Sequence, residues 1–269
     1  MIKDISNEEY HSNTEYISRS GLHEFSKLPY KYWLKFLDPN RKKFSQSNAM
    51  LIGSLVHCYI LEPENFNDIY AIQPIGLGQS KDDKAQKSLF IEKNKGKEVI
   101  SIDDSRKARW LADKILSHPM AKKLLDYEGN NEQAYFFNHP LTGTPSKFKP
   151  DRETVNANGL ILDLKKCRDI SEFQFGKDCI NYWYHVEAAW YMDGFYAETG
   201  VKPKAFVFIL VEEETGIVDV RNAPKEMIDL GRKTYQQALV HYEECRQDGY
   251  FPAYSNKIKP IQLPYWAFK

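Results

Sequence analysis

The sequence has little of what membrane-spanning, secreted or disulfide-stabilised proteins require. No stretch approaches the ~18 uncharged apolar residues of a membrane helix. The N-terminal segment M-I-K-D-I-S-N-E-E-Y contains acids and lacks the apolar core of a secretion signal. The four cysteines form no CxxC pair, which argues against a zinc site and a disulfide framework. These absences predict a cytoplasmic protein with reduced thiols and no membrane partner.

The sequence also lacks an excess of charge of either sign. Its 37 basic and 37 acidic residues give a net charge of zero, whereas proteins that coat nucleic acid nonspecifically are usually basic. This balance still allows an enzyme that gathers its basic residues in one channel and its acids around a metal. With 269 residues and no repeats or linkers, we expect a single domain over residues 1–269, with a helical part (1–130) and a catalytic part of sheet and helices (131–269).

The spacing of apolar residues changes character near the middle of the chain. Before it, helical spacing and capping residues predict a short helix capped by Ser18 or Ser20, an apolar helix from Ser47 to Pro63, one capped by Asp103 or Asp104, and one after Pro119. Residues 75–97 predict an exposed segment. Later patterns predict strands within residues 131–140, 146–155, 159–166 and 204–211, and helices within 171–199 and 224–248. The expected fold class is mixed α/β, with a central mixed sheet flanked by helices and a helical N-terminal layer.

One predicted hairpin, K-P-D-R-E-T-V-N-A-N-G-L-I-L-D-L-K, carries the chemistry. Side chains alternate along a strand, so Asp163 and Lys165 share one face while the three leucines at 160, 162 and 164 face a core. A three-residue loop A-N-G, with Gly159 in the left-handed conformation, would pair Asp151 opposite Lys165 and beside Asp163. A loop with an even number of residues would put the two acids on opposite faces.

Two converging carboxylates suit Mg²⁺, which prefers oxygen ligands and is commonly completed by substrate phosphate. A lysine within reach would stabilise charge on that phosphate or position the attacking water. The alternative is that Asp163 and Lys165 form an ordinary ion pair on an edge strand.

The motif K-P-D followed twelve residues later by D-L-K resembles the signature of PD-(D/E)xK nucleases. The segments G-S-L-V-H-C-Y-I-L-E-P-E-N-F, Y-H-V-E-A-A-W-Y-M-D-G-F and L-P-Y-W-A extend this resemblance to the exodeoxyribonuclease VIII (RecE) nuclease-domain family. The resemblance implies that His57, Asp151 and Asp163 bind the metal, that Lys165 is the catalytic lysine and that Glu132 is an accessory acid. From the residues alone, His57 would more often be a core histidine, and Glu132 a solvent-facing strand residue.

Two positions depart from the family pattern. Lys166 and Cys167 stand where a threonine usually follows the catalytic lysine. Glu187 stands where the family has glutamine, four residues before the retained Tyr191, and both are counted among the candidate catalytic residues. A carboxylate at this position could add a metal ligand, alter metal preference or repel phosphate.

The resemblance implies a Mg²⁺-dependent exonuclease, with Mn²⁺ as a substitute, that degrades linear double-stranded DNA from 5′ to 3′. It implies 3′ single-stranded tails for phage or prophage recombination, a ring-shaped homo-oligomer (a tetramer by family analogy) and a single-strand annealing protein as partner. The alternatives are an endonuclease on the same metal site, a DNA-binding recombination module whose site has decayed, and a nonenzymatic scaffold.

Overall fold

The structure is a computed structural model that describes residues 2–3, 5, 7–41, 46–74, 80–154, 159–255 and 257–268. Its helices are α1 (Asn7–Ser12), α2 (Arg19–Lys27), α3 (Pro29–Tyr32), η1 (Trp33–Leu37), α4 (Asn48–Leu61), η2 (Pro63–Asn65), α5 (Phe66–Ile69), α6 (Lys81–Lys93), α7 (Ile102–Ser117), α8 (Pro119–Leu125), α9 (Glu172–Asn181), α10 (Tyr184–Thr199), α11 (Lys225–Asp248) and η3 (Tyr265–Phe268). Its strands are β1 (Ile2–Lys3), β2 (Tyr70–Ile72), β3 (Glu98–Ile100), β4 (Asn130–Asn131), β5 (Ala134–Asn138), β6 (Pro145–Phe148), β7 (Arg152–Glu153), β8 (Leu160–Cys167), β9 (Ala205–Glu212) and β10 (Val218–Asn222).

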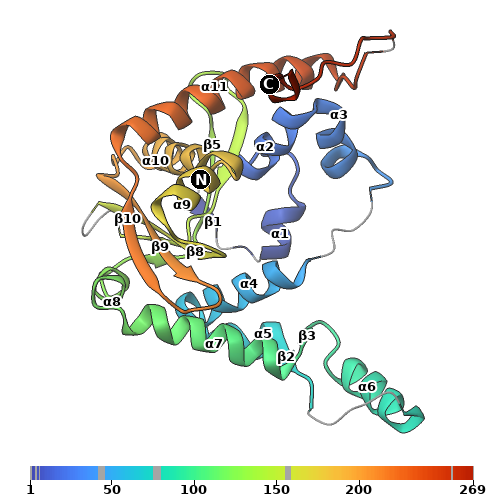
Figure 1. Cartoon of the computed structure of the whole chain (residues 1–269), viewed down its shortest axis with the longest axis vertical. Coiled ribbons are helices and arrows are strands. Elements are labelled where there is room, and N and C mark those ends of the chain that lie inside the picture. Colours follow the sequence, from blue (N-terminus) through green and yellow to red (C-terminus); the bar gives the residue numbers. More distant parts are fainter. Residues whose placement is uncertain are drawn as a thin grey trace.

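The central sheet has five strands in the order β10, β9, β8, β7, β4. β8 and β9 are parallel, and the other neighbouring strands are antiparallel. Parallel strands need a long crossover connection, and α9 and α10 supply it between β8 and β9. The predicted mixed sheet flanked by helices is therefore confirmed (Figure 1). β5 does not join this sheet but pairs with β6 on one side and β1 on the other, and β2 pairs with β3.

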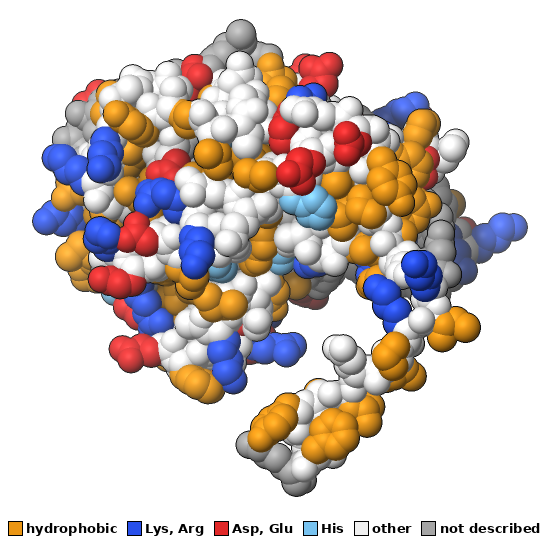
Figure 2. Space-filling view, turned by 90° about the horizontal axis from the view of Figure 1, so that it is seen from above, with side chains coloured by type: hydrophobic (Ala, Val, Ile, Leu, Met, Phe, Trp, Pro, Cys, Tyr) orange, Lys and Arg blue, Asp and Glu red, His pale blue; other side chains and the backbone are white. Residues whose placement is uncertain are grey.

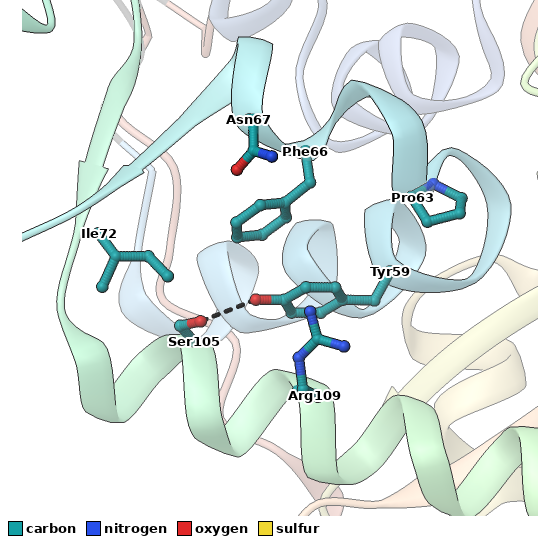
Figure 3. A pocket seen from close by; sticks show the side chains of 7 residues that line it. All are labelled: Tyr59, Pro63, Phe66, Asn67, Ile72, Ser105 and Arg109. Carbon is teal, nitrogen blue, oxygen red and sulfur yellow. Dashed lines mark hydrogen bonds between the residues drawn. The ribbon is translucent and has the colours of Figure 1, made fainter.

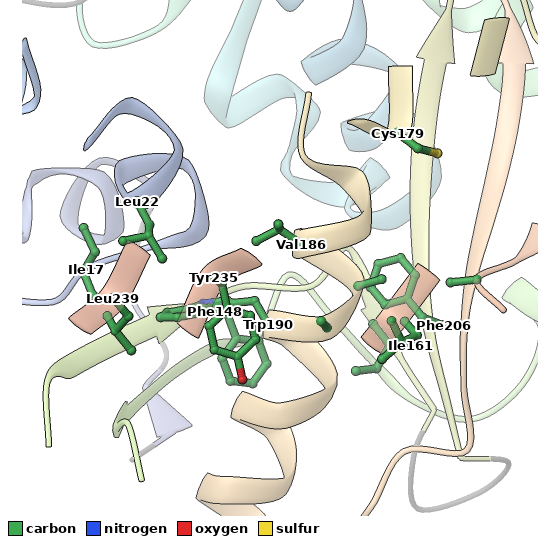
Figure 4. Packing of buried hydrophobic residues seen from close by; sticks show 14 of the residues in the cluster. Ile17, Leu22, Phe148, Ile161, Cys179, Val186, Trp190, Phe206, Tyr235 and Leu239 are labelled. Atoms are coloured by element: carbon green, nitrogen blue, oxygen red, sulfur yellow. The ribbon is translucent and has the colours of Figure 1, made fainter. Parts of the chain in front are cut away.

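Both faces of β8 are buried. Ile161 belongs to a cluster with Trp190 of α10 and Tyr235 of α11 (Figure 4). Leu164 packs on the other face with residues of α4 and α7, as predicted for the leucine face. Because α2 contributes Leu22 to the first cluster, the N-terminal helices are divided between the two faces of the sheet rather than stacked in one layer.

Helix α4 is apolar on most sides and lies between α7 and β8. It begins after Ser47, whose hydroxyl accepts a hydrogen bond from the backbone of Met50, and it ends at Leu61, both as predicted. A helix of this kind is stable only when most of its surface is covered. Its burial places His57 against the backbone of β8, with the side chain 29% exposed.

The predicted cap of α7 needs revision, whereas the exposure predicted for the segment before it is confirmed for the described residues of α6. The cap of α7 is Ser101, whose hydroxyl accepts from the backbone N–H of Asp104, so neither Asp103 nor Asp104 is the cap. Serine is a favoured cap because its hydroxyl accepts a hydrogen bond from the first turn. The two aspartates lie within that first turn, where their negative charges interact favourably with the positive end of the helix dipole. The segment expected to be exposed contains helix α6, which has no buried residue and stands apart from the sheet (Figure 1); residues 75–79 lie outside the described part.

The segment after α11 exposes many large apolar side chains. They include Tyr254, Ile258, Ile261, Trp266 and Phe268, each at least 73% exposed. Figure 2 shows hydrophobic side chains on an arm that stands away from the body. None of the described helices is long and apolar enough to cross a membrane.

Candidate active site

The backbone of Leu164 in β8 organises the site. Its N–H donates to Asp151 Oδ2 at 2.6 Å, and its carbonyl accepts from His57 Nε2 at 3.0 Å. In a strand the N–H and C=O of one residue point to the same edge. At Leu164 that edge faces away from β9, just beyond Arg152, where β7 begins. One residue of the strand therefore holds two side chains that come from opposite halves of the chain.

His57, Glu132 and Asp151 form a cluster suited to a cation. Their ligand atoms all lie within 4.8 Å of one another. His57 Nδ1 lies 3.5 Å from Asp151 Oδ1 and 3.8 Å from Glu132 Oε1. Since His57 Nε2 donates to a carbonyl, Nδ1 is the nitrogen left to face the carboxylates, and such outer contacts commonly orient a metal-binding histidine. Two carboxylates and one imidazole fit a divalent cation.

Glu132 is held in a conformation that non-glycine residues rarely adopt. Its φ is +49°, in the left-handed region, and its backbone N–H donates to the carbonyl of Asp151 at 3.0 Å. Lys149 pairs with its carboxylate, and the side chain is only 13% exposed. Glu132 is therefore not a solvent-facing strand residue, and its strained backbone directs a carboxylate to the cluster.

Asp163 and Lys165 project beside this cluster, toward α10. Lys165 Nζ lies 2.7 Å from Asp163 Oδ2 and 3.2 Å from Glu187 Oε2. Among the described residues these two carboxylate oxygens are buried without a hydrogen-bond partner of proper geometry, so the lysine compensates them only as an ion pair. An incompletely satisfied carboxylate next to the cluster also fits a site that receives a cation.

The acids and the histidine shift one another's ionisation. Burial by itself lowers the pKa of His57, but Asp151 and Glu132 outweigh it and raise the pKa to about 9. Burial raises the pKa of Asp151, against the attraction of His57 and Lys165. For Glu132, His57 and Lys149 outweigh burial and lower the pKa. The metal-free cluster thus holds a protonated imidazole where a cation would sit.

A second set of charges neutralises Glu187. Arg19 Nη2 lies 2.5 Å from Glu187 Oε1, and Tyr191 donates its hydroxyl to the same oxygen at 3.4 Å. Although burial raises it, the pKa of Glu187 falls to about 2 because Arg19 and Lys165 favour the carboxylate. Burial lowers the pKa of Lys165, but Asp163 and Glu187 outweigh it and raise the pKa. Lys165 is therefore a cation at neutral pH.

The hairpin register differs from the predicted one by two residues. Glu153 pairs with Ile161 and Arg152 with Leu162, so Asp151 falls opposite Asp163 instead of Lys165. Odd-numbered residues of one strand still lie opposite odd-numbered residues of the other, so both acids share a face, as the prediction required. Gly159 has a φ of +78°, the predicted left-handed conformation, whereas loop residues 155–158 lie outside the described part. The predicted three-residue loop is wrong because Thr154 already bonds to Leu160.

Three further residues were not found, or not explained, by the sequence interpretation. Lys166 pairs with Glu213 and Cys167 is buried, so neither side chain replaces the missing threonine hydroxyl at the site. Arg19 was missed because it lies 168 positions from its partner Glu187 and belongs to no recognised motif. The one signal for Arg19 came from Glu187, because a carboxylate that is buried needs a cation near it.

A cavity of about 290 Å³ lies on another side of α4 (Figure 3). It is lined by Tyr59, Phe66 and Arg109, and Tyr59 shares a hydrogen bond of 2.7 Å with Ser105. None of the predicted site residues lines it. The candidate chemistry is therefore at the hairpin and not in this cavity.

The fold and the hairpin site together define a protein of the PD-(D/E)xK nuclease class. The model of one family, described as a PDDEXK-like domain of unknown function (DUF3799), matches residues 18–264, and the chain belongs to this family. The fold is similar to the crystal structure of a "putative exonuclease" from Eubacterium rectale, with 16% identity and a TM-score of 0.62 over 99% of this chain and 98% of that one. A comparison with curated proteins finds no match. The chain is thus a PDDEXK-like nuclease, which confirms the predicted class.

Proposed function

We propose that the protein is a Mg²⁺-dependent deoxyribonuclease that degrades linear double-stranded DNA from 5′ to 3′ and leaves 3′ single-stranded tails. The observation that carries the proposal is the meeting of a histidine and carboxylate cluster with a buried ion-paired lysine at one end of the β7–β8 hairpin. This arrangement suits hydrolysis of a phosphodiester, because it offers a cation site and a second positive charge for one phosphate.

Each residue has a proposed role. His57, Asp151 and Asp163 are the metal ligands, and Glu132 is the accessory acid beside them. When bound, the cation polarises the phosphate and makes a bound water a better nucleophile. Lys165 places its ammonium on the phosphate and stabilises the charge that develops there.

Two residues support the lysine. Glu187 holds the Lys165 ammonium at 3.2 Å, and Tyr191 donates its hydroxyl to Glu187. Mg²⁺ suits the carboxylates, whereas the imidazole of His57 also suits softer cations, so Mn²⁺ should substitute.

The exonuclease part of the proposal rests on the likeness in fold to the Eubacterium rectale protein, whose description names that activity. A role in phage or prophage recombination in the cytoplasm, with a single-strand annealing protein as partner, follows from the RecE resemblance. A ring-shaped tetramer is part of the same proposal. The exposed apolar segment from Tyr254 to Phe268 supports self-association, because such surfaces usually become covered. Light scattering on the protein with and without residues 254–269 tests this self-association. The number of subunits should fall when the segment is removed, and an unchanged number would contradict a role of the segment in assembly.

The test of the activity compares three substrates in Mg²⁺ and in Mn²⁺: 5′-phosphorylated linear duplex, closed circular duplex and 3′-labelled single strand. Linear duplex should be degraded and circles should survive. Asp163→Ala and Lys165→Ala should each lower the rate by at least about 100-fold. Lys166→Ala is the matched control, since its lysine is next in the strand but pairs with Glu213.

The other outcomes separate the alternatives. Cutting of circles would identify an endonuclease on the same site. No degradation with either metal would favour a DNA-binding module with a decayed site. Unchanged rates in both site variants would place the chemistry elsewhere in the chain.

A further inference from the structure

A continuous row of charges leads from helix α2 to the catalytic strand. It runs from Arg19 to Glu187 at 2.5 Å, from Glu187 to Lys165 at 3.2 Å and from Lys165 to Asp163 at 2.7 Å. The two carboxylate side chains are at most 4% exposed and the two cations are each 16% exposed. Charges buried to this degree persist only when they are balanced, and here two acids face two bases.

The balance depends on Arg19. Without it, the single ammonium of Lys165 would have to compensate both Asp163 and Glu187. An ammonium held between two unbalanced carboxylates is less free to contact an incoming phosphate. The remaining negative charge of Glu187 would also repel that phosphate. Arg19 therefore gives Glu187 the net electrostatic effect of a neutral side chain.

Helix α2 is fastened to the turn that presents Glu187. Arg19 Nη1 donates to the carbonyl of Tyr182 at 3.2 Å, and the ring of His23 stacks on Trp183 with centroids 4.8 Å apart. Trp183 has a φ of +63°, unusual for a tryptophan, and its carbonyl accepts the backbone N–H of Glu187 at 2.8 Å. Contacts from α2 thus stabilise the strained turn at Trp183, whose carbonyl is bonded to the backbone of the acid.

We propose that Arg19 is a positioning residue of the nuclease site: through Glu187 it keeps the ammonium of Lys165 available to the scissile phosphate. The inference rests on the proposed function, because it gives Lys165 the phosphate as its target. Arg19 itself is turned to Glu187 and to a backbone carbonyl, and it does not act as a DNA contact.

The experiment is a double-variant cycle of wild type, Arg19→Gln, Glu187→Gln and the double variant, with kcat and KM measured on linear duplex. Arg19→Gln should lower kcat by on the order of tenfold or more, with KM changed by less than about threefold. The double variant should recover most of that loss, since removal of the acid removes the need for the base. Arg232→Gln is the control, because it breaks another arginine–carboxylate pair of α10, with Asp193, that is more exposed and lies outside the row of charges.

The outcomes distinguish this role from others. If the double variant is as slow as Arg19→Gln, Arg19 acts through the fold and the inference is overturned. A large rise in KM with kcat unchanged would make Arg19 a DNA contact and overturn it too. If Arg19→Gln does not fold, as judged by circular dichroism, the double variant is compared with Glu187→Gln: equal kcat values support the inference, and a kcat lower by about tenfold or more in the double variant overturns it. An inactive wild type refutes the proposed function itself, whereas active wild type without rescue refutes only the role of Arg19.

Discussion

Metal binding should depend steeply on pH because of His57. The pKa of this histidine in the metal-free protein is about 9, so at pH 7 a proton occupies the nitrogen that would bind the cation. Displacing it should weaken the apparent affinity about 100-fold relative to pH values well above 9. The Kd should therefore fall about tenfold from pH 7 to pH 8, about fivefold from pH 8 to pH 9, and then level off. Affinity for the cation must rise with pH, because a histidine with a raised pKa holds its proton more tightly and this proton competes with the cation.

Isothermal titration with Mn²⁺ from pH 6.5 to pH 9.5, in buffers of different ionisation enthalpy, measures both quantities. Close to one proton should leave per cation at pH 7, and only about a quarter of a proton at pH 9.5. His57→Gln should abolish the slope, whereas His241→Gln, a change at an exposed residue of α11, should preserve it. Affinity that is independent of pH, without proton release, would refute the assignment of His57 as a ligand.

Three further predictions concern stability. Lys165→Met should cost about 3 kcal/mol or more in urea unfolding, because it leaves the buried carboxylate of Asp163 without its cation and takes one of two cations from Glu187; a loss below about 1 kcal/mol would contradict the buried pairing. Gly231→Ala should lower stability by about 2 kcal/mol or more, since its Cβ would lie 1.9 Å from the carbonyl oxygen of His185, whereas Gly176→Ala in an open helix position should raise the melting temperature slightly. Without metal, stability should fall by up to about 3 kcal/mol as pH rises from 6.5 through 9, because His57 contributes only while protonated in the fold, and a flat profile in chelator would argue against it.

The sequence predicts the parts of this molecule that depend on local chemistry. Period-two alternation identified β8 and its leucine face, and the capping hydroxyl of Ser47 marked the start of α4. Gly159 was assigned its left-handed backbone because a hairpin loop needs one such residue. The class of nuclease was implied by the resemblance of four sequence segments to a known family, and it is confirmed by the matching family model.

What the sequence did not predict depends on contacts between distant segments. β5 and β6 form a sheet with β1 that is separate from the central sheet. No local sequence pattern predicts that β5 pairs with a strand about 130 positions away. The strained backbone of Glu132 is imposed by its bond to the carbonyl of Asp151. Arg19 reaches Glu187 only because α2 packs against α10, so the compensation of the unusual acid became visible only in three dimensions.

The proline in K-P-D explains why the site forms at this end of the hairpin. In the register that pairs Arg152 with Leu162, the residue opposite Leu164 would be Pro150. Proline has no N–H, so it cannot donate to the carbonyl of Leu164 and the ladder cannot continue past β7. That carbonyl then accepts from His57, and the neighbouring N–H donates to the carboxylate of Asp151. The proline thus ends a strand pair and leaves backbone groups that bind the histidine and the first aspartate of the motif.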